Sequence, residues 1–332
     1  MQRAGNKVID LHCHFHVAAA DALLGPFAAQ ASDSLQARFS SPASDAVNRA
    51  QFRAIGPKLT NVDLRIAEMD QLGVDIQVIS PVPGQLVYLA PPEPAREGAR
   101  MINDAIAEAV AKHPERLLGM GVAPMQAPEL AVAELKRCVK QLGMRGMEIS
   151  THVAGRELSD PEFRSFFAAA EELGVLLFMH PLGFTQGERL REHYFNNVIG
   201  NPLESTLAIA HLILDGVLDE LPELKLCVAH GGGYLPMYAG RIDHAFRARS
   251  DCRTHIDKPP SEYLKRLYFD TLVFERAQLD FLLQQYGADR LCLGSDYPFD
   301  MSEPDPVGFL AHLADADREK VLGGNAARLL GL

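Results

Sequence analysis

Basic side chains are scarce in this sequence, and their scarcity limits the classes of partner that we expect. The 332 residues include 32 lysines and arginines against 43 aspartates and glutamates, so the formal net charge is −11. Nucleic acids and anionic membrane surfaces are bound through clustered Lys and Arg side chains. We therefore expect no nucleic-acid partner and no membrane partner.

Paired cysteines and long apolar runs are also missing. The five cysteines form no C-x-x-C pair, and three of them lie inside apolar, strand-like runs, as buried thiols often do. No stretch approaches the roughly 18 uncharged apolar residues that a membrane-spanning helix needs. No basic segment followed by an apolar stretch stands near Met1. These features predict a soluble protein of the reduced cytoplasm.

Hydrophobic periodicity predicts alternating strands and helices along most of the chain. Eight short apolar runs are typical of strands that are buried on both faces, at residues 8–13, 75–80, 117–123, 145–150, 175–179, 224–229, 267–270 and 290–294. Seven further segments carry apolar residues at helical spacing, at residues 62–72, 94–112, 128–142, 161–173, 202–214, 275–286 and 306–314.

This alternation favours an α/β fold, a closed (β/α)8 TIM barrel, over an open doubly wound sheet. The glycine-rich fingerprint of a dinucleotide-binding fold is absent after the first strand. One domain over residues 1–332 suffices, since a barrel of this length needs no second core. The alternation fails in the Ser- and Ala-rich stretch 16–61, which we interpret as an insertion over the barrel mouth because long structureless loops are unusual in compact domains.

Four histidines and one aspartate lie at the ends of four predicted strands: His12, His14, His180, His230 and Asp296. Active sites of such barrels form at the carboxyl ends of the strands. His12 and His14 are two positions apart, so on a strand their side chains leave the same face. A single H-x-H pair is more often a pair of buried structural histidines, but imidazoles and a carboxylate at four strand ends are typical of a catalytic divalent-metal site.

At these residues the chain resembles the amidohydrolase superfamily (amidohydrolase family 2). More narrowly, it is similar to the branch named for aminocarboxymuconate-semialdehyde decarboxylase, which also holds aromatic-acid decarboxylases. The resemblance covers nearly the whole chain through the motifs IDLHCH at 9–14, RIAEMDQ at 65–71, FMHP at 178–181, AHGGG at 229–233, GRIDH at 240–244, GSDYPF at 294–299 and GNA at 324–326.

The resemblance implies that His12, His14, His180 and Asp296 bind one divalent ion and that His230 is the catalytic acid/base beside a metal-bound water. Zinc suits donors rich in histidine, and manganese is the alternative, since it works in related decarboxylases. Histidine suits the role of acid/base because its ordinary pKa lies near 6.5, within reach of both protonation states.

The resemblance also implies substrate-binding residues. Arg53 and Arg241 match arginines that bind the substrate carboxylate, and the second of these reaches the site from a neighbouring subunit, which predicts a homodimer. Phe184 and Phe299 match apolar pocket positions. Asn197 stands where the decarboxylase carries a pocket tryptophan, and this chain has no tryptophan at all, so its pocket has changed.

Three functions remain open on the sequence. The first is a metal-dependent, non-oxidative decarboxylase (carboxy-lyase) acting on a small unsaturated or aromatic carboxylic acid. The second is a hydrolase of a lactone, amide or carbon–carbon bond, or a hydratase, with the same site. The third is a barrel that only binds ligand, which the intact set of five residues disfavours. Asp296 followed by Tyr-Pro, together with Arg53 and Arg241, favours the decarboxylase.

Overall fold

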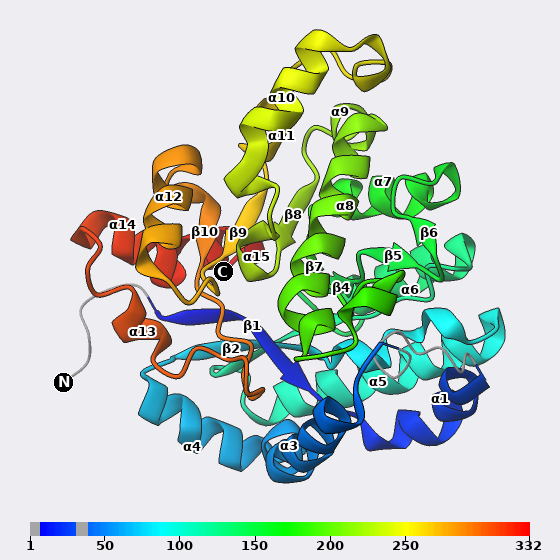
Figure 1. Cartoon of the computed structure of the whole chain (residues 1–332). Coiled ribbons are helices and arrows are strands. Elements are labelled where there is room, and N and C mark those ends of the chain that lie inside the picture. The colour runs from blue at the N-terminus through cyan, green and yellow to red at the C-terminus, as the bar shows by residue number, and fades with distance from the viewer. Residues whose placement is uncertain (1–6, 31–38) are drawn as a thin grey trace.

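A sheet of parallel strands forms the centre of the molecule, and helices surround it (Figure 1). The computed structural model describes residues 7–30 and 39–332. The eight strands follow one another in the order β1-β2-β3-β4-β7-β8-β9-β10. Their bounds are β1 Ile9–Phe15, β2 Ile76–Pro81, β3 Leu117–Gly121, β4 Gly146–Ile149, β7 Leu176–Met179, β8 Lys225–Val228, β9 Tyr268–Asp270 and β10 Leu291–Cys292.

The first and last strands meet, so the barrel is nearly closed. The backbone N–H of Leu11 donates to the carbonyl of Leu293 (2.9 Å), and that of His14 donates to the carbonyl of Tyr297 (2.9 Å). β10 is shorter than the predicted strand 290–294, because the backbone N–H groups that follow Cys292 do not bond to β9. The N–H of Leu293 donates to the carbonyl of Val321 (3.0 Å), and the N–H of Gly294 donates to the Thr271 hydroxyl (3.3 Å). The predicted α/β barrel is confirmed.

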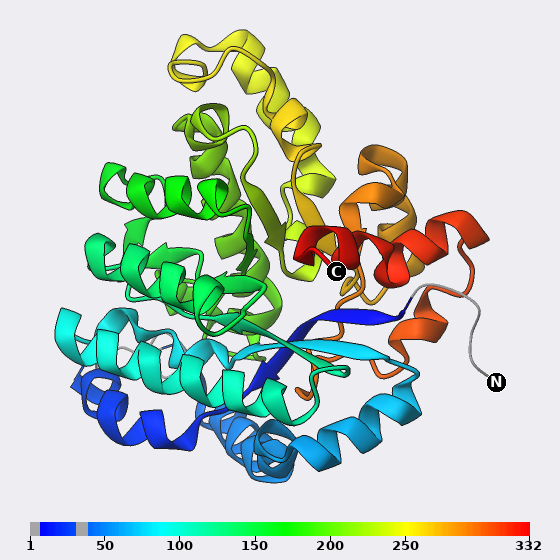
Figure 2. The ribbon, with the colours of Figure 1, turned by 180° about the vertical axis from the view of Figure 1, so that it is seen from behind.

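Every predicted helix is present, with ends that differ by a few residues. The helices outside the first insertion are α4 Val62–Leu72, α5 Pro92–Lys112, α6 Pro128–Lys140, α7 Arg164–Glu172, α8 Asn201–Leu214, α9 Val217–Glu220, α10 Ala239–Ala248, α11 Pro260–Leu264, α12 Arg276–Tyr286, α13 Pro306–Phe309, α14 Asp315–Glu319 and α15 Asn325–Leu330. A short hairpin, β5 His152–Val153 and β6 Arg156–Glu157, follows β4. Seen from behind, α5, α6 and α7 lie side by side along the sheet (Figure 2). Among the described residues, no helix has both the length and the apolar character needed to cross a bilayer.

The described residues between β1 and α4 are largely helical, although the sequence suggested only an interruption of the alternation. It contains α1 (Ala18–Gln30) and α3 (Pro42–Thr60). Ser41 caps α3 by accepting a hydrogen bond from the backbone N–H of Ser44, and a proline stands at the first helical position. Residues 31–38 of the predicted insertion lie outside the described residues.

A bulge in β1 changes which side chains face the barrel interior. Asp10 pairs with Gln77 and Cys13 with Ile79, so three steps along β1 match two steps along β2. Within the bulge, Leu11 packs in the inner apolar cluster with residues of β2, β3, β7, β8 and β10. After it, Cys13 packs in the cluster shared with the surrounding helices. Bulges often redirect side chains beside active sites, and this one leaves Leu11 and His12 both on the interior side of β1, with the His12 ring centroid 5.0 Å from that of Phe178 in the inner cluster.

Four buried polar side chains connect the first strand to the segment after the last one. We call them the Arg65–Ser295 chain: Arg65, Gln77, Asp10 and Ser295. Nη1 of Arg65 donates to the Gln77 carbonyl oxygen (2.8 Å), and the Gln77 amide donates to Asp10 (3.2 Å). Asp10 also accepts from the backbone N–H of Ser295 (3.0 Å) and from its hydroxyl (2.5 Å). Burial raises the pKa of Asp10 to about 6, against the hydrogen bonds from Ser295.

Removing the Arg65 guanidinium from the Arg65–Ser295 chain should destabilise the fold. Arg65 is fully buried and also donates to the backbone carbonyls of His14 and Lys58. In Arg65→Met these acceptors and Gln77 lose their donor, so we expect the free energy of unfolding to fall by about 3 kcal/mol. Urea denaturation followed by circular dichroism measures this. Arg100→Met, an exposed position on α5, is the control and should stay within about 0.5 kcal/mol of the parent; an equal effect in both variants would contradict the role of Arg65.

Candidate metal centre

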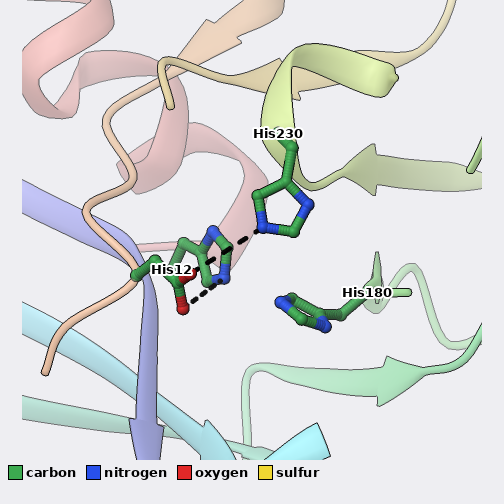
Figure 3. A group of neighbouring side chains, drawn as sticks. His12, His180 and His230 are labelled. Atoms are coloured by element: carbon green, nitrogen blue, oxygen red, sulfur yellow. Dashed lines mark ion pairs between the residues drawn. The ribbon is translucent and has the colours of Figure 1, made fainter. Parts of the chain in front are cut away.

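Side chains from four strand ends converge at the mouth of the barrel. His12 and His14 belong to β1, His180 directly follows β7, and His230 follows β8. Asp296 lies in the segment after β10. Figure 3 shows the rings of His12, His180 and His230 pointing toward one another from three separate segments. The placement at the carboxyl ends of the strands is the one expected for a barrel enzyme.

The distances between the donor atoms suit a shared ion. Oδ1 of Asp296 lies 3.4 Å from Nε2 of His12 and 3.1 Å from Nε2 of His14. The two Nε2 atoms are 3.2 Å apart. Ligand atoms at about 2.1 Å from one ion stand roughly 3.0–3.4 Å from one another. One donor atom each from His12, His180, His230 and Asp296 also lies within 4.8 Å of the others.

Two of the imidazoles are oriented by hydrogen bonds on the far side of the ring. Nδ1 of His12 lies 2.7 Å from Oδ2 of Asp270, a residue at the end of β9. Nδ1 of His14 lies 3.0 Å from the carbonyl oxygen of Pro81. Because these acceptors require a proton on Nδ1, the lone pair of each ring is left on Nε2, which faces the site.

Unpaired polar atoms in the site also fit a bound cation. Within the described part of the chain, neither ring nitrogen of His180 has a hydrogen-bond partner, although this residue is only 4% exposed. Burial and the neighbouring histidines hold the pKa of His180 well below its usual value, so its ring is neutral. Neutral imidazole is the form that binds metal ions.

The charges in the site favour a cation as well. Burial alone would raise the pKa of Asp296, but the charge of His12 and hydrogen bonds from the histidines hold it well below its usual value. Burial alone would lower the pKa of His12, but Asp296 and Asp270 raise it to about 10. A position that attracts a proton this strongly also attracts a divalent ion, so the donor set fits one.

The backbone at two of these residues is strained. His230 has a φ of 57° and Asp296 a φ of 61°, values that non-glycine residues rarely adopt. Such strain persists where the surrounding structure enforces it, often at functional sites. After His230 the chain needs glycine, since a Cβ on Gly233 would lie 2.3 Å from the carbonyl oxygen of Pro202. The His-Gly-Gly-Gly turn thus places the imidazole at the mouth.

Two cavities meet at His230. The first, of about 300 Å³, is lined by His180, His230, Asp296 and residues of α3, among them Phe52. The second, of about 310 Å³, shares His230 and Asp296 and is otherwise mainly apolar, with Met237, Leu272 and Phe274 among its lining residues. His230 is therefore within reach of molecules in either cavity.

The predicted substrate-binding residues differ in where they lie. Phe299 lines the first cavity, with its ring centroid 5.4 Å from that of His14 and 5.9 Å from that of Phe52. Asn197 lines both cavities. Phe184 is half-buried and lines neither of them. Arg53 and Arg241 are exposed, on α3 and α10, and also line neither cavity.

Sequence reasoning missed three residues at or beside the site. Arg191 and Gln51 line the first cavity, and no motif or spacing marks either position. Glu148 of β4 is fully buried, with Oε2 3.9 Å from Nδ1 of His14, and burial raises the pKa of its carboxyl. A single acidic residue inside the apolar run 145–150 was the signal that could have identified it.

Comparisons with known proteins agree with this site. The model of a family described as amidohydrolase matches residues 9–332. The chain is 39% identical over 285 residues to the 2-amino-3-carboxymuconate-6-semialdehyde decarboxylase of Dictyostelium discoideum, an alignment that covers 85% of this chain and 79% of that protein.

Solved structures of two decarboxylases resemble the whole molecule. One is a dihydroxybenzoic acid decarboxylase of Polaromonas sp. JS666 with bound manganese and the inhibitor 2-nitroresorcinol (TM-score 0.82, 26% identity, 98% of this chain and 97% of that chain covered). The other is a 5-carboxyvanillate decarboxylase of Novosphingobium aromaticivorans with manganese and 4-hydroxy-3-methoxy-5-nitrobenzoic acid (TM-score 0.88, 25% identity, 100% and 98% covered). The His/Asp group of this chain is a divalent-metal site.

Metal analysis tests the predicted ligands. We expect about one divalent ion per parent chain after dialysis and almost none in His180→Ala or His14→Ala, because each variant removes one of the proposed donors. Inductively coupled plasma mass spectrometry measures the content. His152→Ala, outside the lining of both cavities, should keep its metal. A full complement of metal in His180→Ala would show that His180 is not a ligand. A full complement in His14→Ala would show the same for His14 and would favour His230 as the ligand instead.

Proposed function

Since this chain belongs to the amidohydrolase family and is a metal-dependent decarboxylase, we propose that it removes carbon dioxide from a small, planar, unsaturated or aromatic carboxylic acid. The observation that carries this proposal is the convergence of His12, His180, His230 and Asp296 beside a cavity of about 300 Å³. A cavity of this size is at the lower end for small-molecule sites. It suits a substrate of about one ring.

We propose His12, His14, His180 and Asp296 as the residues that hold the ion. The Nε2 atoms of His12 and His14 and Oδ1 of Asp296 already lie within 3.4 Å of one another. The bound ion would polarise substrate oxygen atoms and so stabilise the charge that develops as the C–C bond breaks. We propose Zn²⁺ because imidazole donors suit it, with Mn²⁺, present in both solved relatives, as the alternative.

We propose that His230 supplies the proton that decarboxylation consumes. Loss of carbon dioxide leaves an electron pair on the substrate carbon, and a proton must replace the carboxyl group there. Nε2 of His230 lies 3.9 Å from Oδ2 of Asp296, and the ring lines both cavities. We propose that the imidazolium donates its proton to this carbon and returns to the neutral ring.

The remaining walls suit a flat molecule. Phe299 and Phe52 stand edge to face, with ring centroids 5.9 Å apart, at one wall of the first cavity, and a planar substrate can pack against such rings. We propose Phe299 and Asn197 as substrate contacts in the present arrangement. Phe184 is proposed as a contact too, and it would have to shift toward the cavity.

We propose that the segment 16–61 covers the mouth of a single barrel domain. His16, Asn48, Gln51 and Phe52 of this segment line the first cavity, so α3 forms part of the wall. Arg53 follows these residues on α3 and is exposed. To bind a substrate carboxylate, as proposed from the resemblance, Arg53 would have to turn inward from the surface of α3.

We propose that Arg241 reaches a site in a second copy of the chain. It lies on α10, a helix with no buried residue among Ala239–Ala248. With α11, this helix extends away from the barrel (Figure 1). The neighbouring Tyr234 and Tyr238 are 42% and 64% exposed. We propose a homodimer in which this projection packs against the partner and Arg241 completes the partner's site.

A substrate panel tests the proposed activity. Purified, metal-loaded protein is incubated with aromatic acids, muconate-type acids and lactones, and the release of carbon dioxide and of acid are recorded separately. We expect carbon dioxide from at least one aromatic or unsaturated acid and no acid release from lactones. Acid release without carbon dioxide would contradict decarboxylation and would indicate hydrolysis.

Substitution of His230 separates proton transfer from metal binding. In His230→Ala we expect most of the metal to remain and the turnover number to fall at least ~100-fold, the lower end for loss of a general acid or base. Steady-state kinetics with metal analysis on the same sample measures both, and His152→Ala is the control that should change neither. Near-normal turnover in His230→Ala would exclude it from the mechanism.

Hybrid dimers test the role of Arg241. His230→Ala and Arg241→Ala chains, each expected to be inactive alone, are co-expressed with different tags, and the doubly tagged hybrids are isolated. One of the two sites in each hybrid then has both groups, because a two-fold interface exchanges the same patch in both directions. We expect the hybrids to regain up to about half of the parent activity. Hybrids no more active than either variant would mean that Arg241 contributes to the site of its own chain or to no site.

A further inference from the structure

The imidazole of His230 lacks a support that two neighbouring histidines have. Nδ1 of His12 lies 2.7 Å from Oδ2 of Asp270, and Nδ1 of His14 lies 3.0 Å from the carbonyl oxygen of Pro81. Nδ1 of His230 is inaccessible to solvent and has no hydrogen-bond partner among residues 7–30 and 39–332. The direction of the His230 ring therefore depends largely on the backbone that carries it, which has the rare φ of 57°.

The turn that carries His230 is attached to a neighbouring strand by a carboxylate. The backbone N–H of Gly231 donates to Oδ1 of Asp270 (2.9 Å), the last residue of β9. The N–H of Gly233 donates to the carbonyl oxygen of His230 (3.2 Å), which closes the turn on itself without connecting it to β9. The hydrogen bond to Asp270 therefore fixes the residue that directly follows His230.

The same carboxylate also contacts the metal centre. Oδ2 of Asp270 is the atom that lies 2.7 Å from Nδ1 of His12, while Oδ1 accepts from Gly231 and from the backbone N–H of Leu272 (3.2 Å). The Asp270 side chain is fully buried and lines neither cavity at the mouth. It is therefore out of reach of a substrate in either cavity, and its effect on the reaction passes through His12 and His230.

A glycine leaves room for the contact between Asp270 and His12. An added Cβ at Gly294 would lie 2.8 Å from Cβ of Asp270 and 2.9 Å from Cβ of His12. Non-bonded carbon atoms pack at about 3.5–4.0 Å, so a side chain at this position would displace one of the two residues or both. Gly294 begins the motif GSDYPF, and its lack of a side chain keeps the carboxylate behind His12.

We propose that Asp270 is a positioning residue for both functional parts of the site, the bound ion and the proton donor. Through Oδ2 it orients His12 toward the ion, and through Oδ1 it holds the turn that directs His230 at the substrate. This inference rests on the proposed function, which gives His230 the role of proton donor. A carboxylate suits the double role because both of its oxygens accept hydrogen bonds, whereas the side-chain amide of asparagine accepts through one oxygen.

Asparagine at this position separates the two roles. A backbone N–H always donates, whereas His12 can carry its proton on either ring nitrogen. In Asp270→Asn we therefore expect the amide oxygen to keep the hydrogen bonds from Gly231 and Leu272, and the amide nitrogen to face Nδ1 of His12. Nε2 of His12 then carries the proton and binds the ion poorly. Asp270→Ala removes both acceptors.

Metal affinity and amide exchange measure the two roles without substrate. By competition with a chelator, the affinity for Zn²⁺ should fall at least about tenfold in both variants, the lower end for loss of a partner behind a ligand. By NMR, the Gly231 amide should exchange as slowly in Asp270→Asn as in the parent, and faster in Asp270→Ala.

Turnover is compared at saturating metal with an acid that the parent decarboxylates. The turnover number should return close to that of the parent in Asp270→Asn and stay at least about tenfold lower in Asp270→Ala, with KM little changed in both. The control is Asp280→Asn, which removes an aspartate–histidine contact of similar length, 2.9 Å to Nε2 of His312, outside both cavities. It should match the parent in all three measurements.

Parent-like metal affinity in Asp270→Asn, or parent-like Gly231 exchange or turnover in Asp270→Ala, would overturn the inference. If circular dichroism shows that Asp270→Ala does not fold, Gly294→Ala takes its place, because it keeps the carboxylate but displaces it. Its metal affinity should fall at least about tenfold and its Gly231 amide should exchange faster, and a parent-like value of either would contradict the double role. If the parent decarboxylates no acid, the proposed function fails, while metal affinity and amide exchange still decide whether Asp270 holds both groups.

Discussion

The metal-binding side chains depend on one buried polar connection, the hydrogen bonds that Asp10 accepts from Gln77 and Ser295. Closure of the barrel requires the first and last strands to meet, yet β10 keeps only Leu291–Cys292 in the ladder. The Asp10–Ser295 hydrogen bonds, at 2.5 and 3.0 Å, fix the segment after β10 against β1. Asp296 is the next residue, so the contact that closes the barrel also brings its carboxylate to the histidines of β1. A buried network of this kind is stable only when each member is paired, which explains why Arg65 is present at its far end.

The electrostatics of the mouth follow from this closure. A carboxylate with little exposure is brought within 3.4 Å of two imidazoles, and a second carboxylate, Asp270, supports His12 from behind at 2.7 Å. Two acids around one imidazole favour positive charge at its free nitrogen, whereas His180 is kept neutral by burial and by its histidine neighbours. Burying carboxylates without a cation is costly. A divalent ion held by these residues would lower that cost.

Chemistry and recognition are divided between different parts of the molecule. The proposed ligand residues and His230 lie at strand ends, where the backbone is held by the barrel, and the strained φ angles of His230 and Asp296 are maintained by that support. The other walls of the cavity include residues of α3 and the side chain of Arg191. Loops on a rigid scaffold can change without disturbing the reaction centre, so substrate preference in this family can vary while the metal centre is kept.

Local patterns in the sequence determined the strands, most helices and the positions of the five residues at the mouth, because apolar periodicity and strand-end placement depend on neighbouring residues only. His12, His14, His180, His230 and Asp296 could be grouped from the sequence alone, since all strand ends of a parallel barrel face the same way. The tertiary structure alone decided the bulge in β1, the helices of the 16–61 segment and the lining of the two cavities. Arg191 and Gln51 both line the first cavity, although they belong to segments far apart in the chain. Arg53, which the resemblance predicts to bind the substrate carboxylate, lies exposed outside both cavities. Which side chains share a cavity depends on the packing of distant segments, and no local pattern records it.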